Sequence, residues 1–236
     1  MELSLLRHGQ AGTRDNYDRL SDLGREQAQR AGAHCAARRL EFDLILCGSL
    51  RRQRETAEIL ARQLPSAATP VVDARWAEFD LSAVYQEIAP RLAAADPAFR
   101  AEYEAIEREA ADPSHAVHRA WRRADMAVVR AWVEGRFPIA SESWPQFEAR
   151  IASALSGLQD YRAERILVVT SATPIGIATA SIFGPALPHA LPLAGSVYNT
   201  ALTKLRFRES MAGTQWHLSE FNATAHLDEP RLLTLR

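Results

Sequence analysis

Three short apolar runs in the chain are each followed by side chains that could act on a phosphoryl group. The first run leads directly into Arg7, His8 and a glycine, and the second leads into a helix that carries Arg52. The third run, residues 166–170, is followed by Ser171. A neutral imidazole can attack phosphorus while guanidinium groups hold the oxygens, so these residue types are what phosphoryl transfer through a phosphohistidine would need, although each alone is a weak signal.

Predicted strands alternate with predicted helices, which is typical of an α/β fold with a mostly parallel sheet between two layers of helices. Ligands of open α/β sheets bind beyond the carboxyl ends of the strands. The three groups of polar residues are therefore expected to meet at one edge of the sheet. We predict strands near 2–6, 42–47, 71–72, 166–170, 201–207 and 215–221, and helices near 21–39, 50–64, 143–158 and 173–183.

The chain is expected to form a single domain, residues 1–236, with one helical insertion. Segment 82–135 has apolar residues at helical spacing, and Asp112-Pro113 interrupts it midway. This segment breaks the alternation of strands and helices, so we expect it to lie over one end of the sheet as a partial lid.

The composition is that of a globular protein, with 47% hydrophobic residues, 24% charged residues and a formal net charge of −1. Lys204 is the only lysine, but an excess of arginine more often reflects genomic base composition than function. Without a block of basic residues, neither nucleic acid nor an anionic membrane is expected as a partner. The two cysteines, Cys35 and Cys47, fit a reducing compartment, and no signal peptide is evident. We therefore expect a cytoplasmic protein.

The N-terminal motif closely resembles the signature of a known family. Leu5-Leu6-Arg7-His8-Gly9 is similar to the signature of the histidine phosphatase superfamily, whose members share the fold of phosphoglycerate mutase. The resemblance continues in the expected order through segments 20–28, 49–57, 142–150 and 222–227. It covers both ends of the chain and most of the core, and it leaves out the insertion.

The resemblance implies a role for each candidate residue. His8 matches the nucleophile that becomes phosphorylated, and Arg7 and Arg52 match the arginines that bind the phosphoryl group. Glu78 falls where the family places its general acid/base carboxylate, and Asp80 is the alternative for that role. No metal ion and no organic cofactor are implied.

Ser171 departs from the family pattern, which presents a second histidine after the last core strand. A serine hydroxyl can donate a hydrogen bond to phosphate, but it cannot carry charge. Losing one preorganised donor typically costs about 10²–10³ in rate, so reduced activity is expected. The loop after the N-terminal motif departs as well, although Arg14 and Asn16 could serve there. His115 and His118 could replace the missing histidine, but a solvated helix surface is the simpler interpretation and the pair is a poor metal site.

The sequence predicts a phosphomonoester hydrolase of reduced activity that acts through His8 on a small phosphorylated substrate or a phosphoprotein. The alternative is a catalytically inactive member that binds a phosphorylated ligand or partner through Arg7, Arg52 and Ser171. Retention of the nucleophile favours the enzyme, and the serine favours the binding protein. A phosphoglycerate mutase is disfavoured, because reorienting a bound bisphosphate needs a more complete site. The substrate and the oligomeric state stay open.

Overall fold

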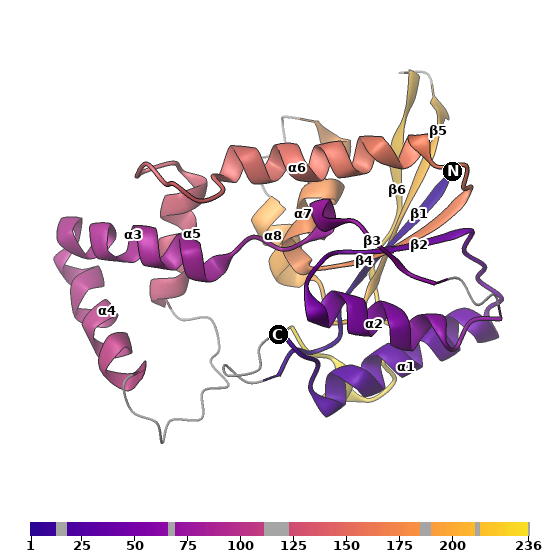
Figure 1. Ribbon diagram of the computed structural model, residues 1–236, viewed down its shortest axis with the longest axis horizontal. Helices are drawn as coiled ribbons and strands as arrows, with labels where there is room; N and C mark the ends of the chain where they lie inside the picture. Colours follow the sequence, from indigo (N-terminus) through magenta and orange to yellow (C-terminus); the bar gives the residue numbers. More distant parts are fainter. Residues whose placement is uncertain (13–17, 66–68, 111–122, 185–189, 211–212, 236) are drawn as a thin grey trace. The chain divides into compact units, whose positions relative to one another are not determined.

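The computed structural model describes residues 1–12, 18–65, 69–110, 123–184, 190–210 and 213–235, and the chain forms two compact units (Figure 1). The core unit consists of Met1–Glu78 and Ile151–Arg236, and the helical unit consists of Phe79–Arg150. The insertion expected at 82–135 falls within the helical unit. Its function as a lid stays a prediction.

The core unit is built on a six-stranded sheet with the order β3-β2-β4-β1-β5-β6. The first four strands along the chain pair in parallel, and the last two run antiparallel at one side of the sheet. The α/β class with a mostly parallel sheet is therefore confirmed. The strands are β1 (Glu2–Arg7), β2 (Leu44–Cys47), β3 (Val71–Val72), β4 (Arg165–Thr170), β5 (Leu202–Ser210) and β6 (Gly213–Ala223).

The register of the parallel strands brings the chemistry-bearing residues to one edge of the sheet. Arg7 at the end of β1 is the register partner of Thr170 at the end of β4. Cys47 at the end of β2 pairs with Val169 of β4. Because β5 runs antiparallel to β1, its beginning lies at this edge as well.

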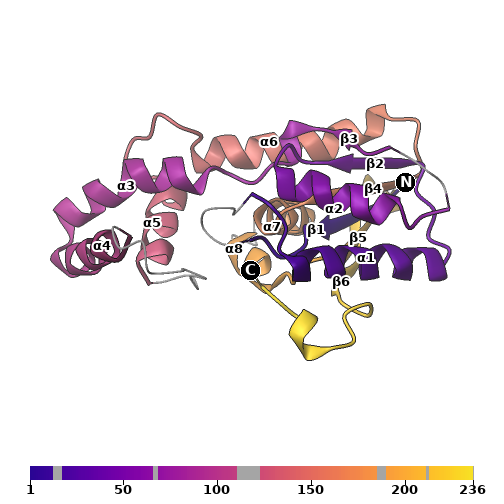
Figure 2. The same ribbon diagram turned by 60° about the horizontal axis from the view of Figure 1, so that its bottom comes forward.

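Helices cover both faces of the sheet. Helices α1 (Asp22–Ala37) and α2 (Arg51–Ala61) pack side by side on one face, and α7 (Ala172–Ala180) packs against β1 on the other (Figures 1 and 2). Ser21 begins α1 as expected, since its hydroxyl accepts the Gly24 N–H at 3.0 Å. The core unit also contains short 3₁₀ helices, namely η2 (Ala74–Trp76), η3 (Gly157–Asp160), η4 (Ser181–Phe183) and η5 (Pro230–Leu232).

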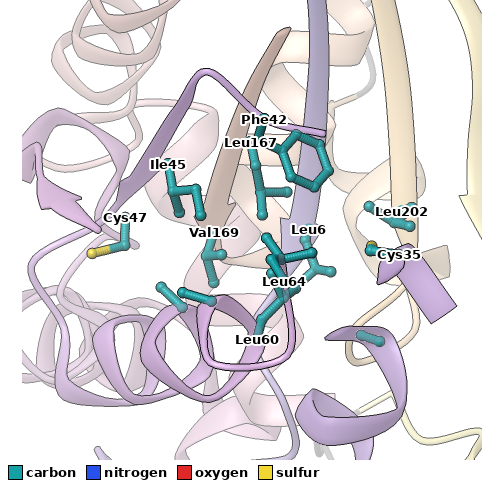
Figure 3. Close-up of a cluster of buried hydrophobic side chains, with 13 residues drawn as sticks. Leu6, Cys35, Phe42, Ile45, Cys47, Leu60, Leu64, Leu167, Val169 and Leu202 are labelled. Atoms are coloured by element: carbon teal, nitrogen blue, oxygen red, sulfur yellow. The ribbon is translucent and has the colours of Figure 1, made fainter. Parts of the chain in front are cut away.

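Buried apolar side chains fill the space between the sheet and helices α1 and α2 (Figure 3). Leu6 of β1 belongs to this cluster, and successive side chains along a strand point to opposite faces. Burying a leucine fully stabilises the fold by roughly 1.5–3 kcal/mol, so the cluster holds the strand that carries the N-terminal motif. The cluster also includes Phe42, Ile45, Leu60, Leu64, Leu167 and Val169.

The helical unit contains α3 (Leu81–Ala95), α4 (Pro97–Ala110), α5 (Arg123–Val133) and the first part of α6 (Trp144–Ser156). Its core is aromatic, with Phe79 at 4.5 Å from Trp132 and Trp144 at 5.9 Å from Phe147 between ring centroids. Asp112-Pro113 lies outside the described residues. Within the described part of the chain, no helix combines the length and apolarity that crossing a bilayer requires.

Helix α8 (Ala190–Ser196) is not predicted from the sequence, where Pro185, Pro188 and Pro192 favour a loop. Pro192 lies in the first turn, where a backbone N–H has no partner within the helix, so the proline costs little there. A glycine on α7 permits the close packing of α8. A Cβ on Gly176 would lie 2.3 Å from the carbonyl oxygen of Ala190.

Candidate active site

The backbone of His8 is held from two sides at the end of β1. Its N–H donates to the carbonyl oxygen of Thr170 at 2.8 Å, and its own carbonyl accepts from Nδ2 of Asn199 at 3.0 Å. His8 is only 4% exposed. The imidazole therefore projects from a main chain with little freedom to move.

The hydrogen bonds of the His8 ring define its tautomer. Nδ1 lies 2.7 Å from the carbonyl oxygen of Gly9, which can only accept, so Nδ1 carries the proton. Nε of Arg52 donates to Nε2 at 3.2 Å, so Nε2 carries the lone pair. Burial, helped by the positive charges of Arg52 and Arg7, holds the pKa of His8 well below its usual value. The ring is thus neutral at neutral pH, with an unprotonated Nε2 that could act as a nucleophile.

Gly9 allows the N-terminal motif to pass close to α1. A Cβ at this position would lie 2.3 Å from the carbonyl oxygen of Gly24, which is backbone and cannot turn away. The Gly9 N–H donates to Oγ1 of Thr56 at 3.1 Å, and that hydroxyl donates to the carbonyl of Arg52 at 2.7 Å. The motif is therefore joined to the helix that supplies the arginine.

Both arginines of the site are buried. Nη1 of Arg7 donates to the carbonyl oxygen of Val197. Nη1 of Arg52 donates to Oδ1 of Asp18 at 3.1 Å, while Oδ2 of Asp18 accepts the N–H of Arg51 at 3.0 Å. A guanidinium and a helix N-terminal N–H are donors of the kind that bind phosphate. The Asp18 carboxylate therefore occupies groups that a phosphoryl oxygen would use.

Ser171 is the N-cap residue of α7 and is 1% exposed, but its hydroxyl makes no capping hydrogen bond. Its Oγ instead accepts from Nε2 of Gln53 at 2.8 Å. Gln53 is buried in α2, next to Arg52 in sequence. The amide thus links the end of β4 to the helix that binds His8.

Glu78 and Asp80 bind different helices. Oε2 of Glu78 accepts the N–H of Thr173 at 3.2 Å, at the same end of α7 as Ser171. Asp80 is exposed and caps α3, since its Oδ1 accepts the N–H of Ala83 at 3.0 Å. Asp80 therefore has a structural explanation, whereas Glu78 lies beside another candidate residue.

Of the five predicted site residues, Arg7 and His8 are neighbours in sequence and Arg52 contacts the His8 ring directly. Ser171 and Glu78 both lie at the start of α7. Four residues considered as substitutes fall outside the described residues, namely Arg14, Asn16, His115 and His118. Within the described ranges, no group of three or more His, Cys, Asp or Glu residues is arranged to hold a metal ion.

Sequence reasoning overlooks three residues that contact the site. Gln53 stands within the segment that resembles the family, and an uncharged polar side chain on the buried face of a helix is a usable signal. Asp18 lies within the loop predicted after the N-terminal motif and carries no local pattern. Asn199 contacts His8 across 191 positions of sequence, because the antiparallel β5 begins where β1 ends.

A sequence profile of the histidine phosphatase superfamily (branch 1) matches residues 3–224 of the chain. Among curated proteins, none matches the sequence. The chain resembles the structure of a mycobacterial glucosyl-3-phosphoglycerate phosphatase in complex with inorganic phosphate. The two share 23% identity and a TM-score of 0.62, over 95% of this chain and 98% of that chain.

Two further solved structures are similar. Bacillus stearothermophilus YhfR has 22% identity and a TM-score of 0.64, over 96% of this chain and 99% of that chain. The phosphoserine phosphatase of Entamoeba histolytica, in complex with 3-phosphoglyceric acid, has 19% identity and a TM-score of 0.59, over 96% and 98%. These likenesses confirm the expected fold.

Proposed function

The chain belongs to the histidine phosphatase superfamily, branch 1, and we propose that it hydrolyses phosphate monoesters through a phosphohistidine on His8. Membership places the protein among hydrolases of phosphate esters. The observation that carries the mechanism is the His8 tautomer, with the proton on Nδ1 bound to Gly9 and the lone pair on Nε2 beside Arg52. A neutral imidazole in this orientation is ready to attack phosphorus.

In the first step, Nε2 of His8 attacks phosphorus in line, so the N–P bond forms as the P–O ester bond breaks. The Nε–H of Arg52 must leave the lone pair of His8 for this to happen, and it then donates to a phosphoryl oxygen. Arg7 and Arg52 stabilise the charge on the equatorial oxygens. Glu78 supplies the proton that the leaving oxygen takes up.

In the second step, water attacks the phosphohistidine. Glu78, left ionised by the first step, accepts a proton from the water as the new P–O bond forms. The N–P bond breaks, and its electron pair returns to Nε2 of His8. Inorganic phosphate then leaves, and the site regains its starting protonation state. The cycle requires only residues of the chain and water.

For the substrate, we propose a small phosphorylated molecule, with a phosphoprotein as the alternative. The names of two similar structures, a glucosyl-3-phosphoglycerate phosphatase and a phosphoserine phosphatase, support the former. Fold similarity does not identify the substrate, because specificity depends on the residues around the site.

A catalytically inactive protein that binds a phosphorylated ligand is the second candidate function. The observation that favours it is the replacement of a chargeable donor by the hydroxyl of Ser171, which is expected to weaken catalysis. The bond between Asp18 and Arg52 points the same way, because it must be broken for phosphate to bind. A mutase is disfavoured for the same reasons.

Turnover of p-nitrophenyl phosphate separates the two functions. We expect wild-type protein to release p-nitrophenol and His8→Ala to be inactive. His34→Gln, which alters a histidine elsewhere in the core unit, is the matched control and should retain full activity. Equal rates for wild type and His8→Ala, with phosphate still bound, would leave only the binding function.

A further inference from the structure

The hydroxyl of Ser171 is unusual for its position in the fold. A serine at a helix N-cap ordinarily accepts a backbone N–H from the first turn. In α7 the carboxylate of Glu78 accepts the N–H of Thr173 instead, and the Ser171 hydroxyl makes no capping bond. Its Oγ accepts from Nε2 of Gln53 at 2.8 Å. The serine is thus available for another purpose.

The orientation of the Gln53 amide follows from its other partners. Oε1 accepts the N–H of Leu50 at 3.1 Å, and Nε2 donates to the carbonyl oxygen of Trp76 at 3.3 Å. If the amide were turned over, its NH₂ would face the N–H of Leu50 and its oxygen would face the carbonyl oxygen of Trp76, and neither pair can form a hydrogen bond. Nε2 therefore faces Ser171, and the serine Oγ is the acceptor of their hydrogen bond.

A hydroxyl that accepts from a fixed donor directs its own hydrogen away from that donor. Ser171 directly follows Thr170, whose carbonyl accepts the N–H of His8 at 2.8 Å. The same sheet edge carries Arg52, so a phosphoryl group on His8 would lie among these residues. We propose that Gln53 is a positioning residue that orients the Ser171 hydroxyl to donate to this phosphoryl group. This inference rests on the proposed function.

The same geometry limits what can replace the serine. The Gln53 amide lies directly against position 171, since its Nε2 is 2.8 Å from Oγ of Ser171. A histidine introduced by Ser171→His, if it pointed along the present Oγ, would meet Nε2 of Gln53. Ser171 and Gln53 therefore behave as a pair, and Ser171→His should raise activity only together with Gln53→Ala.

The pair is tested by a double-mutant cycle with Gln53→Met, Ser171→Ala and the double variant. The readouts are the affinity for orthovanadate, by calorimetry, and kcat and KM with p-nitrophenyl phosphate. Hydrogen bonds to charged groups correspond to about tenfold to hundredfold in affinity. We expect each single variant to bind orthovanadate at least tenfold more weakly, and the double variant to be no worse than Ser171→Ala alone.

Gln53→Met could also act by disturbing α2, so Gln53→Glu supplies an independent comparison. The glutamate accepts but does not donate at neutral pH, so the Ser171 hydroxyl would turn to donate to it and be lost to phosphate. The added negative charge weakens orthovanadate binding whether residue 171 is serine or alanine. The loss of the hydroxyl as a donor weakens binding only when residue 171 is serine. Coupling between the two positions is therefore expected with either substitution.

Losses that simply multiply in the double variant would overturn the inference, because Gln53 would then act on the fold alone. Failure of wild-type protein to bind orthovanadate, or a Gln53→Glu that binds as wild type does, would overturn it too. Failure of the proposed function has a different signature, since His8→Ala would then turn over substrate as fast as wild type while the coupling in binding persisted.

Discussion

Nε of Arg52 donates to Nε2 of His8 across 3.2 Å, so the atom that we propose as the nucleophile is hydrogen-bonded to a group that we propose binds the phosphoryl group. This hydrogen bond orients the imidazole, and the positive charge of Arg52 disfavours protonation of Nε2. In the proposed mechanism a phosphoryl group competes for the same N–H, and its binding frees Nε2 of His8 for attack. Arg52 would therefore act both in the resting site and in the proposed reaction.

Arg52→Ala should lower kcat/KM by roughly 10²–10³, the usual cost of losing one preorganised donor. The pKa of His8 should also rise, because one of the positive charges that lower it is removed. Arg54→Ala, an exposed arginine of the same helix, is the matched control. Equal kinetics of the two variants would contradict the role of Arg52.

Activity should not depend on protonation of His8 near neutrality. Its folded-state pKa lies well below 6.5, so the neutral, nucleophilic form persists as the pH falls through 6.5. Protonation of His8 should therefore cause no fall in log kcat/KM between pH 8 and 6.5. Any fall caused by His8 should come below pH 6.5. An NMR titration of the His8 ring, compared with Arg52→Ala, checks the assignment.

Stability should fall below pH 6.5 through His226. Burial lowers the pKa of His226 from 6.5 to about 4, and Thr200 contacts its Nε2 at 3.1 Å. The unfolded chain binds the proton more readily than the folded chain does. Protonation of His226 therefore costs no folding stability above pH 6.5, and the free energy of unfolding falls as the pH drops from 6.5 towards 4. The slope is about 1.4 kcal/mol per pH unit for this group.

Urea unfolding between pH 4 and 8 measures that dependence. His226→Gln should be less stable than wild type at pH 7 and should show a shallower loss below pH 6.5. A variant with the same pH dependence as wild type would show that other groups dominate in this window.

Asp18→Asn should bind inorganic phosphate a few-fold more tightly than wild type. The carboxylate of Asp18 is about half exposed and contacts Arg52 at 3.1 Å, and pairs of this kind are worth about 0.2–1 kcal/mol. Calorimetry at low salt measures the effect, with Asp22→Asn as an exposed control. Weaker binding by Asp18→Asn would indicate that Asp18 orients Arg52 rather than competing with phosphate.

Gly9→Ala should destabilise the fold by roughly 1–3 kcal/mol, as overpacking does, because its Cβ would lie 2.3 Å from the Gly24 carbonyl oxygen. Gly195→Ala is the matched control, since nothing lies within 4 Å of a Cβ there. Thermal unfolding compares the two. Similar midpoints would show that the loop after His8 can move away from α1.

The residues that local sequence identifies are those whose position follows from a strand end. Arg7 and His8 come directly after a buried apolar run, and Arg52 lies in the first turn of the next helix, so parallel pairing alone brings them together. Ser171 was placed by the same reasoning at the end of β4. The parallel part of the fold could be predicted for this reason.

The parts that escaped prediction depend on contacts distant in sequence. Asn199 reaches His8 only because an antiparallel strand begins beside β1, and Gln53 meets Ser171 across 118 positions. The helix α8 packs closely against Gly176 of α7, a contact that no local pattern predicts. No local pattern encodes these relationships, because each is a property of the packed chain.

The proposed function requires a covalent bond between phosphorus and Nε2 of His8, and rapid quenching detects that bond. Protein mixed with p-nitrophenyl phosphate is quenched in alkali, where phosphohistidine survives, and its peptides are analysed by mass spectrometry. We expect one phosphate on the peptide that contains His8, and none in His8→Ala. Sustained turnover by His8→Ala, or phosphate trapped on another residue, would contradict it.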